Sequence, residues 1–276
     1  MVYLKKITYL KQLNKVKNLK ASIFVTNYNN AKFITKCLNS VINQDYKNIE
    51  ILFIDDLSLD NSLEIVKKFK NKIKIVKKKT KKTGIGSFDQ MQSLFECYKK
   101  SRGDIIFFLD SDDYFKKKKV SKFMNLFSQK KNLKALYDLP ILKSKKSEIK
   151  MNLKYNLFKN LWSDLVPTSC IAMRRNSFKE LYRLTNFKKF KDIWFDFRIL
   201  IALKANSEVF QYLNDHLTFY RQLETSASSN FKYLSKNWWK RRSQAHQYVK
   251  FFLKKNNIFY KKNFDYFLTK SINKFL

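Results

Sequence analysis

Three aspartates stand directly after an apolar run in the middle of the chain. Residues 105–109 are all apolar, and Asp110, Ser111, Asp112 and Asp113 follow them without a break. Such a run predicts a buried central strand of a parallel sheet, and open α/β folds bind ligands at the carboxyl ends of these strands. Carboxylates crowded together repel one another, and a divalent cation between them removes the repulsion. The pattern predicts a ligand or metal site, against the alternative of a polar turn that caps the next helix.

The N-terminal half of the chain alternates predicted strands and helices. Strands are expected at residues 22–26, 49–54, 73–76 and 105–109, and amphipathic helices at 33–42, 63–69 and 88–100. This alternation implies right-handed crossovers and a parallel sheet whose strands all end at one edge. The polar residues that follow three of these strands, at 26–30, 55–56 and 110–113, are therefore expected to meet in one crevice.

Three short motifs, in this order and at this separation, resemble the family 2 glycosyltransferases. They are Val25-Thr26-Asn27-Tyr28-Asn29, Ile54-Asp55-Asp56-Leu57-Ser58-Leu59-Asp60 and Phe108-Leu109-Asp110-Ser111-Asp112-Asp113. The resemblance covers residues 21–115 well and the remainder loosely. It implies an α/β fold of the GT-A (Rossmann-like) type, with a mostly parallel central sheet and flanking helices. It also implies transfer of a sugar from a nucleotide diphosphate donor with inversion, in the presence of Mn²⁺ or Mg²⁺.

Carried over residue by residue, the resemblance assigns the contacts of the donor nucleotide. Thr26, Tyr28 and Asn29 would lie at the nucleotide, with Tyr28 stacked on the base, and Asp56 would accept the imide proton of the base, which favours uracil. One departure concerns the helix before the third motif. Many members have an Arg-Asn pair there that helps to hold the donor, whereas this chain has Asp89-Gln90-Met91.

The same resemblance assigns the metal. Asp110 and Asp112 match the two acids of the family's DxD motif, so one would meet the ribose or the metal and the other would ligate the metal. The neighbouring Asp113 could take either role, contact with the ribose or ligation of the metal. Physical chemistry agrees with these roles, because a hard divalent cation prefers oxygen ligands and neutralises a departing diphosphate.

An inverting transfer also needs a base that takes the proton of the acceptor hydroxyl as its oxygen attacks. Residues 190–198 resemble the family's acidic helix start, whose Asp is the base and whose Arg lies two turns on. Asp192 fits that register, with Lys191 in place of the usual Glu, and Asp196 is the second candidate one turn further on the same face. The alternative is that these acids are not catalytic and only interact favourably with the N-terminus of a helix, beside buried aromatic residues.

The composition of the chain is strongly basic. It has 58 Lys and Arg against 22 Asp and Glu, a net charge of +36. Such an excess attracts nucleic acid, acidic lipid headgroups or phosphorylated substrates, although an AT-rich genome would also enrich lysine. A basic polyanion-binding protein and a catalytically inactive GT-A protein are the alternatives to an enzyme. The sequence disfavours a nucleic-acid binder, because it has no zinc-finger spacing, ribonucleoprotein motif or clear helix-turn-helix.

Four segments are expected. They are a basic amphipathic segment (1–20), the nucleotide-sugar-binding half (21–115), the acceptor-binding half (116–229) and a helical extension rich in Lys and aromatic residues (230–276). Aromatic residues beside cations suit either a membrane headgroup interface or a helical cap on the sheet. No apolar stretch approaches the ~18 residues of a spanning helix, and the N-terminus lacks a signal peptide's apolar core. We therefore expect a cytoplasmic enzyme of cell-surface glycan synthesis that meets an anionic membrane surface and a saccharide or lipid-linked saccharide acceptor.

Overall fold

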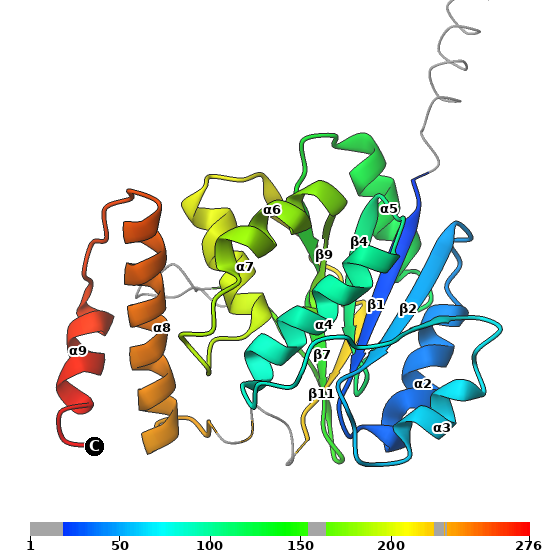
Figure 1. Ribbon diagram of the computed structural model, residues 1–276. Coiled ribbons are helices and arrows are strands. Elements are labelled where there is room, and N and C mark those ends of the chain that lie inside the picture. The colour runs from blue at the N-terminus through cyan, green and yellow to red at the C-terminus, as the bar shows by residue number, and fades with distance from the viewer. Residues whose placement is uncertain (1–18, 154–163, 224–228, 230) are drawn as a thin grey trace, which may run out of the picture.

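The computed structural model describes residues 19–153, 164–223, 229 and 231–276 (Figure 1). The expected basic N-terminal segment therefore lies almost wholly outside the described residues. In chain order the elements up to the middle of the chain are β1 (Ala21–Asn27), α2 (Ala31–Ile42), β2 (Ile49–Asp55), α3 (Ser62–Lys67), β3 (Lys74–Val76), α4 (Gly86–Lys100), β4 (Ile105–Asp110), β5 (Tyr114–Phe115), α5 (Lys119–Gln129) and β6 (Ala135–Tyr137). The remaining elements are β7 (Pro140–Lys143), β8 (Glu148–Lys150), the 3-10 turn η1 (Thr168–Cys170), β9 (Ile171–Arg174), α6 (Arg175–Thr185), α7 (Phe195–Ala205), β10 (Phe210–Tyr212), β11 (Thr218–Arg221), α8 (Lys236–Lys255) and α9 (Phe264–Ile272).

The main sheet of the described residues has seven strands in the order β10-β6-β9-β4-β1-β2-β3. β9 runs antiparallel to both of its neighbours, and the other pairs are parallel. The predicted α/β fold with a mostly parallel sheet is confirmed. The register places Thr26 level with Asp110 of β4, and Asn27 level with Asp55 of β2. The polar ends of three strands therefore lie side by side at one edge of the sheet.

Both faces of this sheet are covered by helices, which explains the continuous apolar runs of its strands. Side chains alternate between the faces along β1. Phe24 packs in the cluster that holds residues of α4, α6 and α7, whereas Ile23 and Val25 pack in the cluster that holds residues of α2, α3 and α5. The central strands are thus fixed from two sides, and their polar ends are held in place by two cores.

A smaller sheet of four strands, in the order β5-β11-β7-β8, stands beside the main one. A buried ion pair lies between the two. The Lys119 ammonium group lies 2.9 Å from the Asp138 carboxylate and also donates to the Thr218 hydroxyl and the Ser169 carbonyl oxygen. Because every partner of this buried charge is supplied by the protein, the contact fixes β11 against the segment before β9.

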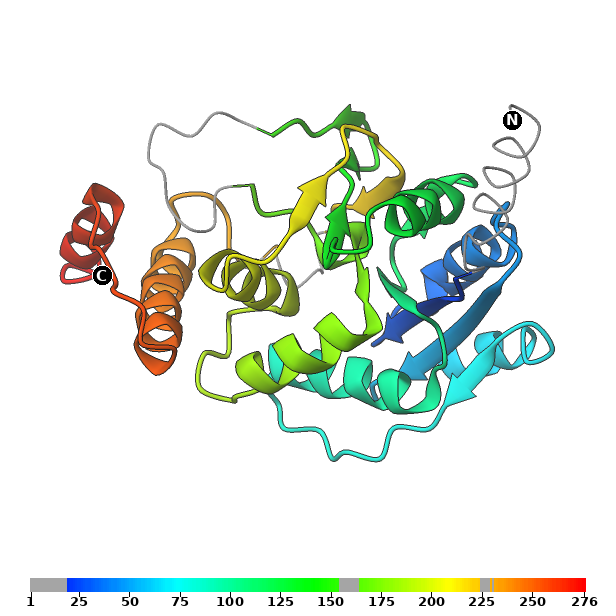
Figure 2. The same ribbon diagram turned by 90° about the horizontal axis from the view of Figure 1, so that it is seen from above.

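The C-terminal extension is helical, as expected, and consists of α8 and α9. Figure 2 shows the two helices at one end of the molecule, beyond α7 and far from β2 and β3. The side chains of Arg242 and His246 on α8 bond the Asp265 carboxylate on α9, and the His246 contact measures 3.0 Å. No helix in the described part of the chain is both long and apolar enough to cross a bilayer.

Candidate active site

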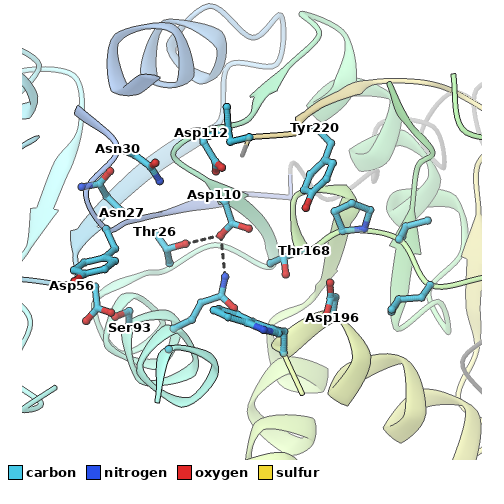
Figure 3. A pocket seen from close by; sticks show the side chains of 18 of the residues that line it. Thr26, Asn27, Asn30, Asp56, Ser93, Asp110, Asp112, Thr168, Asp196 and Tyr220 are labelled. Carbon is cyan, nitrogen blue, oxygen red and sulfur yellow. Dashed lines mark hydrogen bonds between the residues drawn. The ribbon is translucent and has the colours of Figure 1, made fainter. Parts of the chain in front are cut away.

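A cavity of about 510 Å³ opens at the carboxyl ends of β1, β2 and β4 (Figure 3). Segments that are far apart in the sequence line it together. Its lining residues come from β1 and the turn after it, from α4, from the turn after β4, from the segments before β9 and α7, and from β11 and α8. The convergence of polar strand ends that the sequence predicts is therefore observed. Predicted site residues that line the cavity are Thr26, Tyr28, Asp56, Asp110, Asp112 and Asp196.

Asp110 is held in place at the centre of the cavity. The hydroxyl of Thr26 donates a 2.8 Å hydrogen bond to its Oδ1 atom, and the side-chain amide of Gln90 donates a second bond of 2.9 Å to the same atom. Burial raises the pKa of Asp110, and these two bonds oppose the shift by stabilising the carboxylate. Gln90 stands in the segment where the sequence departs from the family it resembles, and here its side-chain amide orients the Asp110 carboxylate.

The other two predicted metal ligands point in different directions. Asp112 lines the cavity, and burial together with the charge of Asp110 raises its pKa to about 7. Asp113 is 1% exposed, and its carboxylate accepts bonds from the Ser169 hydroxyl at 2.6 Å and the Arg221 backbone N–H at 2.8 Å. Asp113 is not among the residues that line the cavity. It ties the turn after β4 to β11.

The donor set at the centre of the cavity fits a hard divalent cation. Among the described residues, no three His, Cys, Asp or Glu side chains form a ready-made metal cluster. Asp110 and Asp112 would supply two carboxylates, and Mg²⁺ commonly binds to one or two carboxylates plus substrate phosphates and water. The crowding of two buried carboxylates raises the pKa of Asp112, and a cation between them would stabilise both charges.

A second group of side chains lies at the end of the cavity next to β2. Asp56 forms an ion pair with Lys78, whose side chain is almost fully buried. Burial raises the pKa of Asp56, and the hydrogen bond from Lys78 lowers it. Tyr28 is 45% exposed, and the Lys82 ammonium group lies 3.2 Å from the centre of its ring. Two lysines of the loop before α4 therefore cover the place where the sequence predicts a nucleotide base.

Asn29, also predicted to bind the nucleotide, is not among the lining residues of this cavity. Its backbone has a φ of 52°, in the left-handed region that asparagine tolerates better than most residues. Its side chain accepts a 2.7 Å bond from the Leu59 N–H, and its own N–H donates to the Ser58 hydroxyl. These contacts join the turn after β1 to the turn after β2.

The two candidate bases lie in different environments. Asp196 is in the first turn of α7 and lines the cavity. Asp192 precedes the helix, does not line the cavity, and is held by Gln244 of α8, which accepts a 2.7 Å bond from its backbone N–H. Helix α7 begins at Phe195, later than the resemblance to an acidic helix start implies. Burial raises the pKa of Asp196 to about 6, and the positive charge of Arg241 limits this rise.

A buried arginine fixes the start of α7. The Arg198 guanidinium group, which is 0% exposed, donates to four carbonyl oxygens at 2.7 to 3.0 Å. These oxygens belong to Thr185, Phe187, Phe190 and Ile193, so one side chain holds the loop before α7. Because Asp196 follows this loop directly, Arg198 positions the acid that faces the cavity.

Arg241 of α8 is a site residue that the sequence did not reveal. It lines the cavity together with Asp196, and its Nε atom donates a 3.2 Å bond to the Asp192 carbonyl oxygen. The sequence places it among many lysines and arginines, and no spacing distinguishes it from them. Only the docking of α8 beside α7 brings this charge to the site.

Comparisons with known proteins agree with this architecture. The model of glycosyl transferase family 2 matches residues 22–182, more than half of the chain. An uncharacterized glycosyltransferase of Nostoc sp. is 26% identical over 219 residues, which are 74% of this chain and 65% of that relative. Staphylococcus aureus TarS, a poly(ribitol-phosphate) β-N-acetylglucosaminyltransferase, is 36% identical over 101 residues, 36% of this chain and 17% of TarS. The chain therefore spans less than two thirds of the length of these relatives.

Solved structures share the fold. TarS 1-349 in complex with UDP-GlcNAc matches with a TM-score of 0.57 and 20% identity, over 83% of this chain and 66% of that one. A mannosyltransferase from Pyrobaculum calidifontis in complex with GDP-Man and Mn²⁺ matches with a TM-score of 0.52 and 13% identity, over 90% of this chain and 67% of that one. The family match covers β1, β2 and β4 and the acids at their ends, and we conclude that the chain belongs to glycosyl transferase family 2.

Proposed function

We propose that the protein transfers a sugar from a UDP-sugar to a glycan or lipid-linked saccharide acceptor, with inversion at the anomeric carbon. The observation that carries this proposal is the order of groups along one cavity. Asp56 stands at one end, Asp110 and Asp112 at the centre and Asp196 at the other end (Figure 3), and Tyr28 lines the same cavity. A nucleotide, a diphosphate and a sugar follow one another in the same order in the donor.

The nucleotide end of the proposed site has a hydrogen-bond acceptor and an aromatic ring. Asp56 would accept the imide N–H of uracil; burial raises the pKa of Asp56, and its ion pair with Lys78 opposes this rise by stabilising the carboxylate. A base stacked on the face of Tyr28 that Lys82 occupies would displace this ammonium group. The complexes of TarS with UDP and UDP-GlcNAc support a uridine donor by family analogy.

Asp110 and Asp112 are the residues that we propose to hold Mn²⁺ or Mg²⁺. The bound ion would neutralise the diphosphate leaving group. Thr26 and Gln90 keep the Asp110 carboxylate pointed at this place, so the protein supplies an oriented ligand without rearrangement. The Mn²⁺ that accompanies GDP-Man in the Pyrobaculum calidifontis mannosyltransferase supports a divalent metal.

We assign the role of general base to Asp196. Its carboxylate would take the proton of the acceptor hydroxyl while that oxygen bonds to the anomeric carbon and the bond to the diphosphate oxygen breaks. A pKa of about 6 leaves the group charged at neutral pH, yet basic enough to accept a proton. Thr168 lies near Asp196 in the cavity (Figure 3) and would bound the acceptor. The name of TarS, a poly(ribitol-phosphate) β-N-acetylglucosaminyltransferase, supports a polymeric acceptor by family analogy.

Nucleotide binding is the first test of this function. UDP together with Mn²⁺ is expected to raise the melting temperature by several degrees, because a ligand at ~100 times its dissociation constant adds about 2.7 kcal/mol of stability. UDP without metal, and GDP, ADP and CDP with metal, are expected to raise it less. Differential scanning fluorimetry measures these shifts. Equal shifts with all four nucleotides would contradict the assignment of Asp56, and no shift with any would contradict a donor site.

The proposed base gives an expectation for the pH dependence of turnover. The rate should rise with pH through about 6, because Asp196 must lose its proton before it can act as a base. Replacing Arg241 by Gln removes a positive charge that lowers the pKa of Asp196, so the acidic limb of the profile should move to higher pH. Arg242→Gln is the matched control, since Arg242 pairs with Asp265 and does not line the cavity. Profiles of kcat against pH that coincide for the wild type and Arg241→Gln would reject the assignment.

A further inference from the structure

Helix α9 presents an apolar face to the outside of the molecule. Phe264, Phe267 and Leu268 stand at i, i+3 and i+4 on one side of the helix and are 63%, 54% and 40% exposed. Phe275 and Leu276, which follow the helix, are also exposed, at 89% and 42%. We call these five residues the outer face of α9. Figures 1 and 2 show the helix as the outermost element at its end of the molecule.

The opposite side of α9 is polar and holds the helix against α8. Asp265 and Thr269 are the residues of α9 that are buried. The Asp265 carboxylate bonds Arg242 and His246, and the Asn273 side chain donates a 3.1 Å bond to the Trp239 carbonyl oxygen of α8. A surface helix normally buries its apolar side and exposes its polar side. Tyr266 packs on the ring of His246, with ring centroids 5.4 Å apart, but the packing of α9 on α8 does not explain the exposed Phe267 and Leu268.

The segment that carries the outer face of α9 is strongly basic. Residues 254–276 contain six lysines and one acid, Asp265, which is already paired. All six lysines are exposed; they are Lys254, Lys255, Lys261, Lys262, Lys270 and Lys274. A second copy of the chain on this surface would bring six further lysines against them, and the charges would repel. A surface of negative charge would be attracted instead.

We propose that the outer face of α9 and its lysines dock on the anionic headgroups of a lipid bilayer. The aromatic and leucine side chains would enter the boundary between headgroups and acyl chains, where such residues gain apolar burial. The lysines would remain level with the lipid phosphates, which they attract within a Debye length. A surface helix binds a membrane stably when it combines the burial of apolar side chains with charge attraction to the lipid headgroups.

This surface lies one helix away from the cavity. Asp265 ties α9 to Arg242 of α8, and the neighbouring Arg241 lines the cavity. Docking of α9 would therefore hold the acceptor end of the cavity near the bilayer surface, where a lipid-linked acceptor presents its saccharide. The inference itself goes beyond the proposed function, because membrane binding is measured without donor or acceptor.

Co-sedimentation of the full chain with lipid vesicles tests the proposal. The protein is expected to bind phosphatidylglycerol-rich vesicles at least about tenfold more tightly than phosphatidylcholine vesicles, and less tightly as salt increases. Phe267→Ser combined with Phe275→Ser removes two exposed rings and should weaken binding to the anionic vesicles by about tenfold or more. Lys270→Glu combined with Lys274→Glu should weaken it through charge alone.

The matched control is Leu63→Ser, because Leu63 is a 44% exposed residue of α3, at the opposite end of the molecule in Figure 1. It should bind vesicles as the wild type does. Wild-type affinity in both double variants would overturn the proposal, as would equal binding to the two kinds of vesicle. Analytical ultracentrifugation without lipid checks the competing occupant. A wild-type dimer that the Phe267→Ser/Phe275→Ser variant loses, without any vesicle binding, would also overturn the proposal in favour of a second copy.

Discussion

The Asp196→Asn variant is expected to lose turnover by ~10² or more while its affinity for UDP stays unchanged. Asn has the shape of Asp, so its side-chain oxygen can still accept the 2.7 Å bond from the Phe197 N–H that orients the group. It cannot take a proton from the acceptor hydroxyl. Because Asp196 lies at the end of the cavity away from Asp56, donor binding should not depend on its charge. Initial rates of UDP release and calorimetric titration with UDP measure the two properties separately.

Asp192→Asn is the matched control for this variant, with the same chemical change four residues earlier. Turnover near the wild-type rate is expected, because Asp192 faces Gln244 of α8 and does not line the cavity. The reverse result, a full rate for Asp196→Asn and a large loss for Asp192→Asn, would show that the family register identifies the base and that the cavity geometry does not. Equal losses in both variants would also contradict Asp196 as the single base.

The strands and their polar ends could be predicted from the sequence because burial on both faces imposes a simple pattern. The run at residues 105–109 is apolar since Phe107 packs in one core cluster and Phe108 in the other. The same reasoning applies to β1 and β2, whose predicted positions agree with the structure to within a residue or two. Once these strands are parallel and adjacent, Thr26 and Asp110 must be close, and they share a hydrogen bond.

Side-chain directions after a strand ends could not be predicted in this way. The sequence does not distinguish the three aspartates Asp110, Asp112 and Asp113. In the structure, the turn after β4 places the Asp113 carboxylate where it accepts hydrogen bonds from the Ser169 hydroxyl and the Arg221 N–H. These partners are more than fifty residues away along the chain, so no local pattern reveals them. A polar residue outside regular structure takes the direction of its best hydrogen-bond partners, and those depend on tertiary contacts.

The start of α7 was missed for a similar reason. The acidic residue at 192 and the aromatic residues after it suggest a helix that begins there, yet the bonds of Arg198 to carbonyl oxygens of the preceding loop keep that loop irregular. Helix α7 therefore begins at Phe195, and Asp196 takes the first-turn position that faces the cavity.

Arg241 could not be predicted as a cavity residue, because it reaches the cavity only through the packing of the C-terminal extension. The sequence could predict which helices and strands form. It could not predict which side chains from distant parts of the chain line the cavity with them.

Replacement of Asp112 by Asn is expected to abolish the metal-dependent part of UDP binding. Asp112 is one of two carboxylates that face the centre of the cavity, and an amide there is a weak, neutral ligand for a hard cation. The wild type should bind UDP more tightly with Mn²⁺ than without it, and Asp112→Asn should bind it equally weakly in both conditions. Isothermal titration of UDP, with and without Mn²⁺, measures this difference.

Asp113→Asn separates metal binding from folding in this experiment. Asp113 is buried, bonds Ser169 and Arg221, and does not line the cavity, so its substitution should lower the melting temperature and keep the effect of Mn²⁺ on UDP affinity. An Asn side chain can donate as well as accept, so one of the two N–H or O–H groups that now bond the carboxylate would lose an acceptor, at a cost of about 1–3 kcal/mol. If Asp113→Asn removes the effect of Mn²⁺ and Asp112→Asn keeps it, the metal is bound by Asp113 within the turn after β4 and not by Asp112 in the cavity.

If neither variant changes the effect of Mn²⁺, Asp112 and Asp113 do not hold the metal. A loss confined to Asp112→Asn would mean that the divalent cation sits between the ends of β1 and β4, where Thr26 and Gln90 already orient Asp110 to receive it.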